Sequence, residues 1–245
     1  MREPDPVRVV ASTPMVAELV RRVGAEAVEV EVLVPAGEAP SSLRRTGPVE
    51  ARLITAELAV ILGLGQEEVI APSLARAVEA GTVVCELGAG LSREELFMLP
   101  DDPERVDPHI WLDPGLWMQA TRPIEESLSA LRPVWAGEFR KRAHAVRFEL
   151  EEAGRLLRRN AQTTLTLDPR PLRTSRAELR YLARAAGVAL KVDPSAASKD
   201  DLETVAFDVL RPPGTKVVAN VREHDLGTVE GLRDYTLDLM LLRRK

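Results

Sequence analysis

The chain of 245 residues is 45% hydrophobic and 29% charged, and it is long enough to bury one large core or two modest ones. Its formal net charge of -5, from 33 basic and 38 acidic residues, lacks the basic excess of a nucleic-acid-binding protein. No stretch approaches the ~20 apolar residues of a membrane span. The composition therefore predicts a soluble globular protein that does not have nucleic acid as a partner.

The N-terminus and the cysteine content bear on location and redox chemistry. Residues 1–6 have no apolar signal core, so the chain is either cytoplasmic or has lost a leader. Cys85 is the only cysteine, which excludes an internal disulfide and a thiolate metal cluster. It lies in the apolar run 82–87, where we expect a buried and unreactive thiol.

The first part of the chain alternates short apolar strands with helices. Residues 7–12 favour a strand, and Thr13-Pro14 opens a helical pattern that Gly24 ends. The same signals predict further strands at 28–34, 58–63 and around Cys85, and further helices at 48–55 and 73–80. Strands and helices at this spacing indicate a parallel sheet whose carboxyl edge carries the binding loops.

After residue 115 the pattern becomes helical. It covers 116–131, and a second stretch from Val134 to about Arg159 is unusually long. Its apolar residues recur at helical spacing: Phe139, Ala143, Val146, Leu150, Ala153 and Leu157. We expect this helix to act as a stiff spine between two α/β segments.

The end of the chain favours a second, smaller α/β lobe. Expected strands are 163–167, 188–192 and 215–221, and expected helices are 175–186 and 200–210. The fold class is thus α/β, with two small lobes of parallel sheet flanked by helices. The predicted domains are an N-terminal lobe 1–131, a linking spine helix 132–160 and a shortened C-terminal lobe 161–245.

The most informative segment is Asp107-Pro108-His109-Ile110-Trp111-Leu112-Asp113-Pro114. Histidine is the commonest metal ligand, and a turn bounded by two prolines fixes the direction of its side chain. His109 is therefore a candidate metal ligand. Asp113 is expected to orient either its own turn or the imidazole of His109, as an acceptor in the second layer of a metal site.

Enzyme signatures do not occur in this sequence. Gly-x-Ser-x-Gly and His-Glu-x-x-His are both absent, and no glycine run completes a phosphate-binding fingerprint. We therefore expect a protein that is not an enzyme.

Several segments, in the same order along the chain, resemble the zinc- or manganese-binding solute-binding protein of bacterial ABC transporters. They are residues 10–16, 28–37, 63–65 and 107–114, Thr174-Ser175, and 181–184. The resemblance implies two α/β lobes joined by a rigid long helix. It also implies a monomer in the periplasm or at the cell surface, whose leader has been removed, that holds one Zn or Mn ion between its lobes and delivers it to an ABC permease.

The resemblance also places the metal ligands of the family on this chain. The second ligand falls on His109, but the first falls on Ser41 and the third on Arg176, whose guanidinium has no lone pair to donate. The fourth, a carboxylate, would lie beyond Val221, where the chain is shorter than the family pattern. Substitutes there are His224, Asp225 and Asp234.

Zinc is bound by about four donor atoms, and one histidine supplies a single donor. We therefore expect a degenerate metal site. Arg176 could instead bind a carboxylate or phosphate group, together with Arg44, Arg45 and Arg173, or could pair with a nearby acidic residue and close an empty cleft. Two functions remain open. One is a solute-binding protein with an altered or lost ligand, and the other is a pseudo-binding protein that serves as a structural or regulatory partner.

Overall fold

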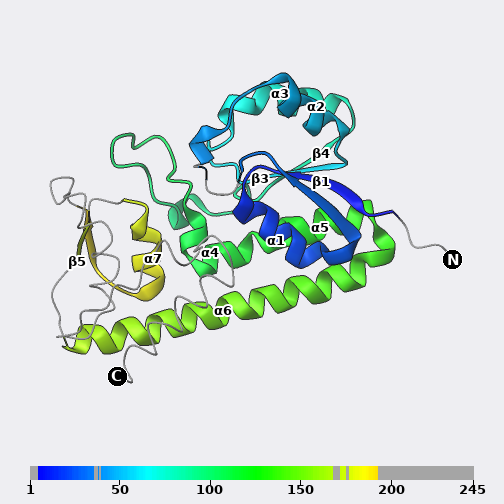
Figure 1. The fold of residues 1–245 in the computed structure, drawn as a ribbon. Helices are drawn as coiled ribbons and strands as arrows, with labels where there is room; N and C mark the ends of the chain where they lie inside the picture. The colour runs from blue at the N-terminus through cyan, green and yellow to red at the C-terminus, as the bar shows by residue number, and fades with distance from the viewer. Residues whose placement is uncertain (1–4, 36–37, 39, 168–171, 175–176, 193–245) are drawn as a thin grey trace. The chain divides into compact units, whose positions relative to one another are not determined.

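The computed structural model describes residues 5–35, 38, 40–167, 172–174 and 177–192 (Figure 1). The chain forms two compact units. Unit 1 comprises residues 1–95 and 118–147, and unit 2 comprises residues 96–117 and 148–245. None of the described helices is both long enough and apolar enough to cross a membrane.

Unit 1 contains a four-stranded parallel sheet of order β2-β1-β3-β4. Its strands are β1 (Val7–Ala11), β2 (Val28–Val32), β3 (Leu58–Ile61) and β4 (Val83–Glu86). Figure 1 shows helices α2 (Gly47–Thr55) and α3 (Ala71–Glu79) on one face, and α1 (Pro14–Gly24) and α5 (Thr121–Leu131) on the other. The predicted parallel α/β sheet is confirmed.

The local signals of unit 1 act as expected from the sequence. Thr13 caps α1, its hydroxyl accepting from the Val16 N–H at 3.4 Å, and Pro14 takes the first turn, where no N–H partner is required. The all-apolar strand β3 is buried along its whole length because it lies inside the sheet, whose two faces are both covered by helices (Figure 1). Cys85 is buried, as predicted, and burial raises the pKa of its thiol to about 11.

A left-handed turn follows β3 at the carboxyl edge of the sheet. Gly63, Leu64 and Gly65 have φ of 75°, 56° and 83°. The buried Glu67 carboxylate closes the turn, accepting from the backbone N–H of Leu62 and of Gly63 at 3.0 Å each. Burial raises the pKa of Glu67 in spite of these bonds. The Leu64 side chain also fills the space that a Cβ on Gly88 would need, since that atom would come within 2.5 Å of Leu64 Cγ.

The long helix α6 (Ala136–Leu167) has 32 residues and, at 1.5 Å per residue, is about 48 Å long. All six apolar positions predicted for its packed face are buried: Phe139, Ala143, Val146, Leu150, Ala153 and Leu157. The predicted strand at 163–167 is wrong, because the helix continues through it. Ala161 extends the same buried face by one turn, and adding residues to an existing helix costs far less than starting a new element.

Unit 2 pairs β5 (Leu172–Thr174) with β6 (Leu190–Val192) in parallel. Between them α7 (Leu179–Ala186) ends at Gly187, which adopts the left-handed conformation with φ of 71°. The predicted helix at 200–210 and strand at 215–221 lie outside the described residues. The lobe boundaries at 131 and 160 stay a prediction, and the segment 96–117 groups with unit 2.

Shorter elements complete the described chain. They are α4 (Pro114–Gln119) and six single turns of 3-10 helix, η1 (Ala25–Ala27), η2 (Pro40–Ser42), η3 (Glu68–Ile70), η4 (Arg93–Glu95), η5 (Ile110–Leu112) and η6 (Pro133–Trp135).

Candidate functional site

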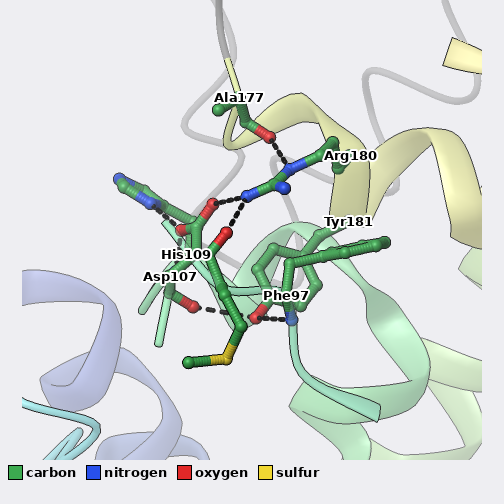
Figure 2. A network of polar contacts seen from close by, with 7 residues as sticks. Phe97, Asp107, His109, Ala177, Arg180 and Tyr181 are labelled. Carbon is green, nitrogen blue, oxygen red and sulfur yellow. Dashed lines mark hydrogen bonds and ion pairs between the residues drawn. The ribbon is translucent and has the colours of Figure 1, made fainter. Parts of the chain in front are cut away.

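His109 lies immediately before η5 in unit 2, and its imidazole is bound to Asp107 (Figure 2). The Asp107 Oδ1 atom faces two nitrogens of His109, the backbone N–H at 3.1 Å and Nδ1 at 2.5 Å. The Asp107 side chain is 1% exposed, whereas that of His109 is 36% exposed. A buried carboxylate therefore holds a histidine that solvent can reach.

The second carboxylate oxygen of Asp107 is held by helix α7. Arg180 Nη2 lies 3.3 Å from Asp107 Oδ2 and also donates to the Met98 carbonyl at 2.6 Å. Burial by itself would raise the pKa of Asp107, but the hydrogen bonds from His109 and Arg180 outweigh burial and lower it. Asp107 is thus an ionised carboxylate with both oxygens occupied.

Tyr181 anchors the same segment through its hydroxyl. The hydroxyl donates to the Asp107 carbonyl at 2.8 Å and accepts from the Phe97 N–H at 3.0 Å. Burial raises the pKa of Tyr181 to about 12, so the hydroxyl remains a donor at neutral pH. Its ring meets that of Phe97 edge to face at 4.9 Å, and the Arg180 guanidinium lies 4.9 Å from the centre of the Phe97 ring.

Asp113 is bound by a second arginine of α7. Its Oδ2 accepts from Arg184 Nε at 3.1 Å and Nη2 at 2.8 Å, and its Oδ1 accepts from the Gly115 N–H at 2.9 Å. These contacts are those of a residue that orients its own turn, the first of the two expected roles. The residue that binds the His109 imidazole is Asp107, for which no role is predicted from the sequence.

Ser41 lies in unit 1, where η2 exposes it to solvent. Its carbonyl accepts from Arg44 Nη1 at 2.6 Å. Arg45 approaches Glu50 at 3.7 Å and Ser73 Oγ at 3.4 Å, so this arginine already has an acidic partner. Of the remaining predicted residues, Arg176, His224, Asp225, Asp234 and the side chain of Arg173 lie outside what the structure describes.

The described residues hold one of the predicted metal ligands, His109. Within residues 5–192 and outside the gaps given above, no three His, Cys, Asp or Glu side chains are grouped so that they could hold a metal ion. His109 Nε2 makes no hydrogen bond with the described residues, and it is the remaining neutral donor of the Asp107–His109 pair. One nitrogen falls short of the three or more protein donors that zinc sites use.

Three residues of this network, Arg180, Tyr181 and Arg184, have no predicted role, although a local signal exists for the two arginines. Arg180 and Arg184 are four residues apart on α7 and so lie on the same side of the helix, where both guanidinium groups approach the Phe97 ring. Tyr181 belongs to the segment that resembles the solute-binding proteins, but nothing local shows that its hydroxyl binds residue 107.

The architecture is shared with solved periplasmic metal-binding proteins. The periplasmic zinc binding protein TroA from Treponema pallidum superimposes with a TM-score of 0.71, at 22% identity over 96% of this chain and 97% of that one. A zinc-bound deletion mutant of ZnuA gives a TM-score of 0.66 at 26% identity, over 83% of this chain and 78% of that one. These likenesses define the class as an α/β solute-binding protein.

The family follows from the sequence match. The model described as "Zinc-uptake complex component A periplasmic" matches residues 9–224, and the chain belongs to this family of zinc- and manganese-binding components of ABC transporters. The predicted fold class and family are confirmed.

Two relatives extend this comparison. "Metal-binding protein YtgA" of Chlamydia muridarum is 29% identical over 157 residues, which are 64% of this chain and 48% of YtgA. "Manganese-binding lipoprotein MntA" of Bacillus subtilis is 24% identical over 148 residues, 59% of this chain and 47% of MntA. The matched part of the chain thus spans about half the length of these relatives.

Proposed function

We propose that this chain is the solute-binding component of an ABC transporter, and that its solute is not held by the zinc or manganese ligands of its family. The observation that carries the proposal is the occupation of the carboxylates around His109. Asp107 is bound by Arg180, and Asp113 is bound by Arg184. The family members work outside the cytoplasmic membrane with an ABC permease, and we assign this chain the same location and partner, acting as a monomer.

The ion pairs around His109 support the proposal that this chain does not bind a metal ion as its family does. Two guanidinium groups from α7 pair with the two carboxylates nearest to His109 in sequence, so the charge of the described site is already balanced without a dication. Ser41 and Arg176 stand where the family has ligands, and a guanidinium repels a cation and has no lone pair to donate. A group that accepts hydrogen bonds from a guanidinium, such as a carboxylate or a phosphate, suits the arginine at position 176 better than a cation does.

A second candidate function follows from the same contacts. Because the Asp107–Arg180 and Asp113–Arg184 pairs satisfy each other, the segment 96–117 needs no solute to stay folded. This favours a pseudo-binding protein that has lost solute capture and serves as a structural or regulatory partner.

Thermal unfolding of the metal-stripped full chain distinguishes these functions. A solute that binds only the folded state, at a hundred times its dissociation constant, adds about 2.7 kcal/mol to the free energy of unfolding. The probes are Zn²⁺, Mn²⁺, phosphate and a small dicarboxylate, each tested on the natural chain, on His109→Ala and on His144→Ala. His144 is an exposed residue of α6 and serves as the matched control.

Each result has a definite meaning. Stabilisation by an anion and by neither metal supports the altered solute. Stabilisation by Zn²⁺ or Mn²⁺ that is lost in His109→Ala and kept in His144→Ala contradicts it and restores metal capture. Stabilisation by none of the probes counts against solute capture and favours the pseudo-binding protein.

A further inference from the structure

The two outer strands of the unit 1 sheet, β2 and β4, differ in what binds their free side. An outer strand pairs with one neighbour only, and the backbone groups of every second residue point away from the sheet. The odd-numbered residues of β2 bond to β1, so the carbonyls of Val30 and Val32 point outward. Arginines of unit 1 bind both carbonyls, Arg21 Nη2 that of Val30 at 2.9 Å and Arg52 Nη2 that of Val32 at 2.6 Å.

The free side of β4 has a different environment. The N–H groups of Val83 and Leu87 donate to β3 and to the residue before it at 3.0 Å each, so the odd-numbered residues face β3. The backbone N–H and C=O groups of Val84 and Glu86 therefore point away from the sheet. The Glu86 carbonyl accepts from the Ala89 N–H at 3.4 Å, and no side chain of the described residues binds the outward groups of β4. In this part of the chain, β4 is thus the outer strand whose carbonyls no arginine covers.

A pocket of about 700 Å³ lies beside the carboxyl end of β4, and all the residues that line it belong to unit 1. One wall is the end of β4 with the loop after it, and another is α5 with the residues just before it. Its apolar lining includes Leu87, Leu91, Met118 and Pro123. The volume lies within the range of about 300–1,000 Å³ that is typical of binding pockets, so large apolar side chains fit inside.

The charged side chains of the pocket are mostly paired with one another. Glu126 pairs with Arg122 at 2.8 Å, and Glu125 pairs with Arg147 at 3.0 Å. The Glu86 carboxylate, by contrast, forms no hydrogen bond or ion pair with the described residues. A strand that pairs with β4 places a side chain opposite Glu86, and there a lysine or arginine is favoured over an acidic residue.

We propose that the free side of β4 is a docking site for an extended segment of another protein. This segment adds a strand to the sheet, places a basic side chain opposite Glu86 and inserts an apolar side chain into the pocket. The outward groups of Val84 and Glu86 are two positions apart, which is the spacing at which an incoming strand presents its own N–H and C=O groups. In such docking the backbone bonds provide affinity and the pocket provides selectivity. The proposal does not depend on the solute of the proposed function.

Amide hydrogen exchange of the full chain, followed by NMR, tests this site. In the chain alone we expect fast exchange at Val84 and Glu86 and slow exchange at Cys85, whose N–H faces β3. The probe is a synthetic octapeptide that alternates valine with lysine. At about ten times its dissociation constant, the peptide should slow exchange at Val84 and Glu86 by about tenfold. Exchange at Val30 and Val32 of β2 should not change.

Two controls separate strand pairing from simple charge attraction. The same peptide with a methyl group on every backbone nitrogen keeps its charge but has no backbone donor, so it should bind about tenfold more weakly or worse. Glu86→Gln should weaken binding of the unmodified peptide by about threefold, because it removes the charge opposite lysine. Glu79→Gln removes an exposed carboxylate of α3 and should leave the affinity unchanged.

Several results would overturn the proposal, and most of them need no variant. Slow exchange at Val84 and Glu86 in the chain alone would show that the free side of β4 is already covered. If that slow exchange appears only as the concentration of the chain rises, the occupant is a second copy of the chain. The proposal also fails if the peptide slows exchange equally at Val30 and Val32, if it protects neither strand, or if the methylated peptide binds as tightly.

Discussion

Unit 1 and the His109 segment of unit 2 are stabilised by different kinds of contact. The central strands of the sheet bury apolar side chains, with Leu58, Ala59 and Val60 fully buried. The segment 96–117 is additionally fixed to α7 by polar contacts, in which two carboxylates of the segment meet two arginines of α7 and the Tyr181 hydroxyl binds a backbone carbonyl. Apolar burial has no direction and adds up gradually, whereas a buried polar network is strong only while every member is paired. We therefore expect the apolar core to tolerate small substitutions better than the polar network of the segment 96–117 does.

The largest effect should come from the sheet. Leu58→Ala removes a fully buried side chain from β3 and leaves a cavity, so we expect the free energy of unfolding to fall by about 3 kcal/mol. Urea denaturation measures this loss. Ile54→Ala on α2 is the control, because Ile54 is 38% exposed and its loss should cost below about 1 kcal/mol. Similar costs at both positions would mean that burial does not dominate unit 1.

A smaller but sharper effect is expected in the polar segment. Tyr181→Phe keeps the buried ring and removes one oxygen, so that the Phe97 N–H and the Asp107 carbonyl both lose their partner. We expect a loss of about 2 kcal/mol, the cost of leaving buried polar groups unpaired. Urea denaturation of the natural chain and of Tyr181→Phe measures this loss in the free energy of unfolding. A loss below about 0.5 kcal/mol would show that this network does not stabilise unit 2.

Glu57 tests whether a polar contact matters within unit 1 as well. Burial would raise its pKa, but Arg132 at 2.8 Å and the Arg8 N–H outweigh burial and lower it. A lowered pKa adds stability above the unfolded value of about 4.3, and this stability disappears as the pH falls through the folded value. Glu57→Gln should therefore cost about 1 kcal/mol at pH 7 and progressively less below pH ~4. An equal cost at both pH values would rule out the ion pair as its source.

The smallest expected effect concerns Cys85. Its thiol is buried in β4 with a pKa raised to about 11, so almost no reactive thiolate is present at neutral pH. We expect iodoacetamide to leave the folded chain unmodified under conditions that alkylate it fully in urea, as mass spectrometry would record. Rapid modification of the folded chain would reveal frequent opening of the sheet.

The same contrast explains how much could be predicted from the sequence. Strands β1, β3 and β4 follow from short apolar runs, β2 follows from alternating valine and glutamate residues, and the buried face of α6 follows from helical spacing. All of these patterns are local properties of the chain. The alternating Thr and Leu residues at 163–167 imitate a strand, and a local pattern cannot show that a helix already extends into them. The pairing of Asp107 with Arg180 joins residues 73 positions apart, and no local pattern contains it. The position of His109 was therefore predictable from its turn, but not what orients it.

The left-handed turn at Gly63, Leu64 and Gly65 has a consequence for any molecule that meets the carboxyl edge of the sheet. Its conformation is set by the hydrogen bonds to the Glu67 carboxylate and by the packing of the Leu64 side chain against Gly88. Both contacts lie within unit 1. The loss of backbone entropy at these residues is complete once the chain has folded. A partner that touches this edge meets a loop that is already ordered, so association there carries no further ordering cost for the loop itself.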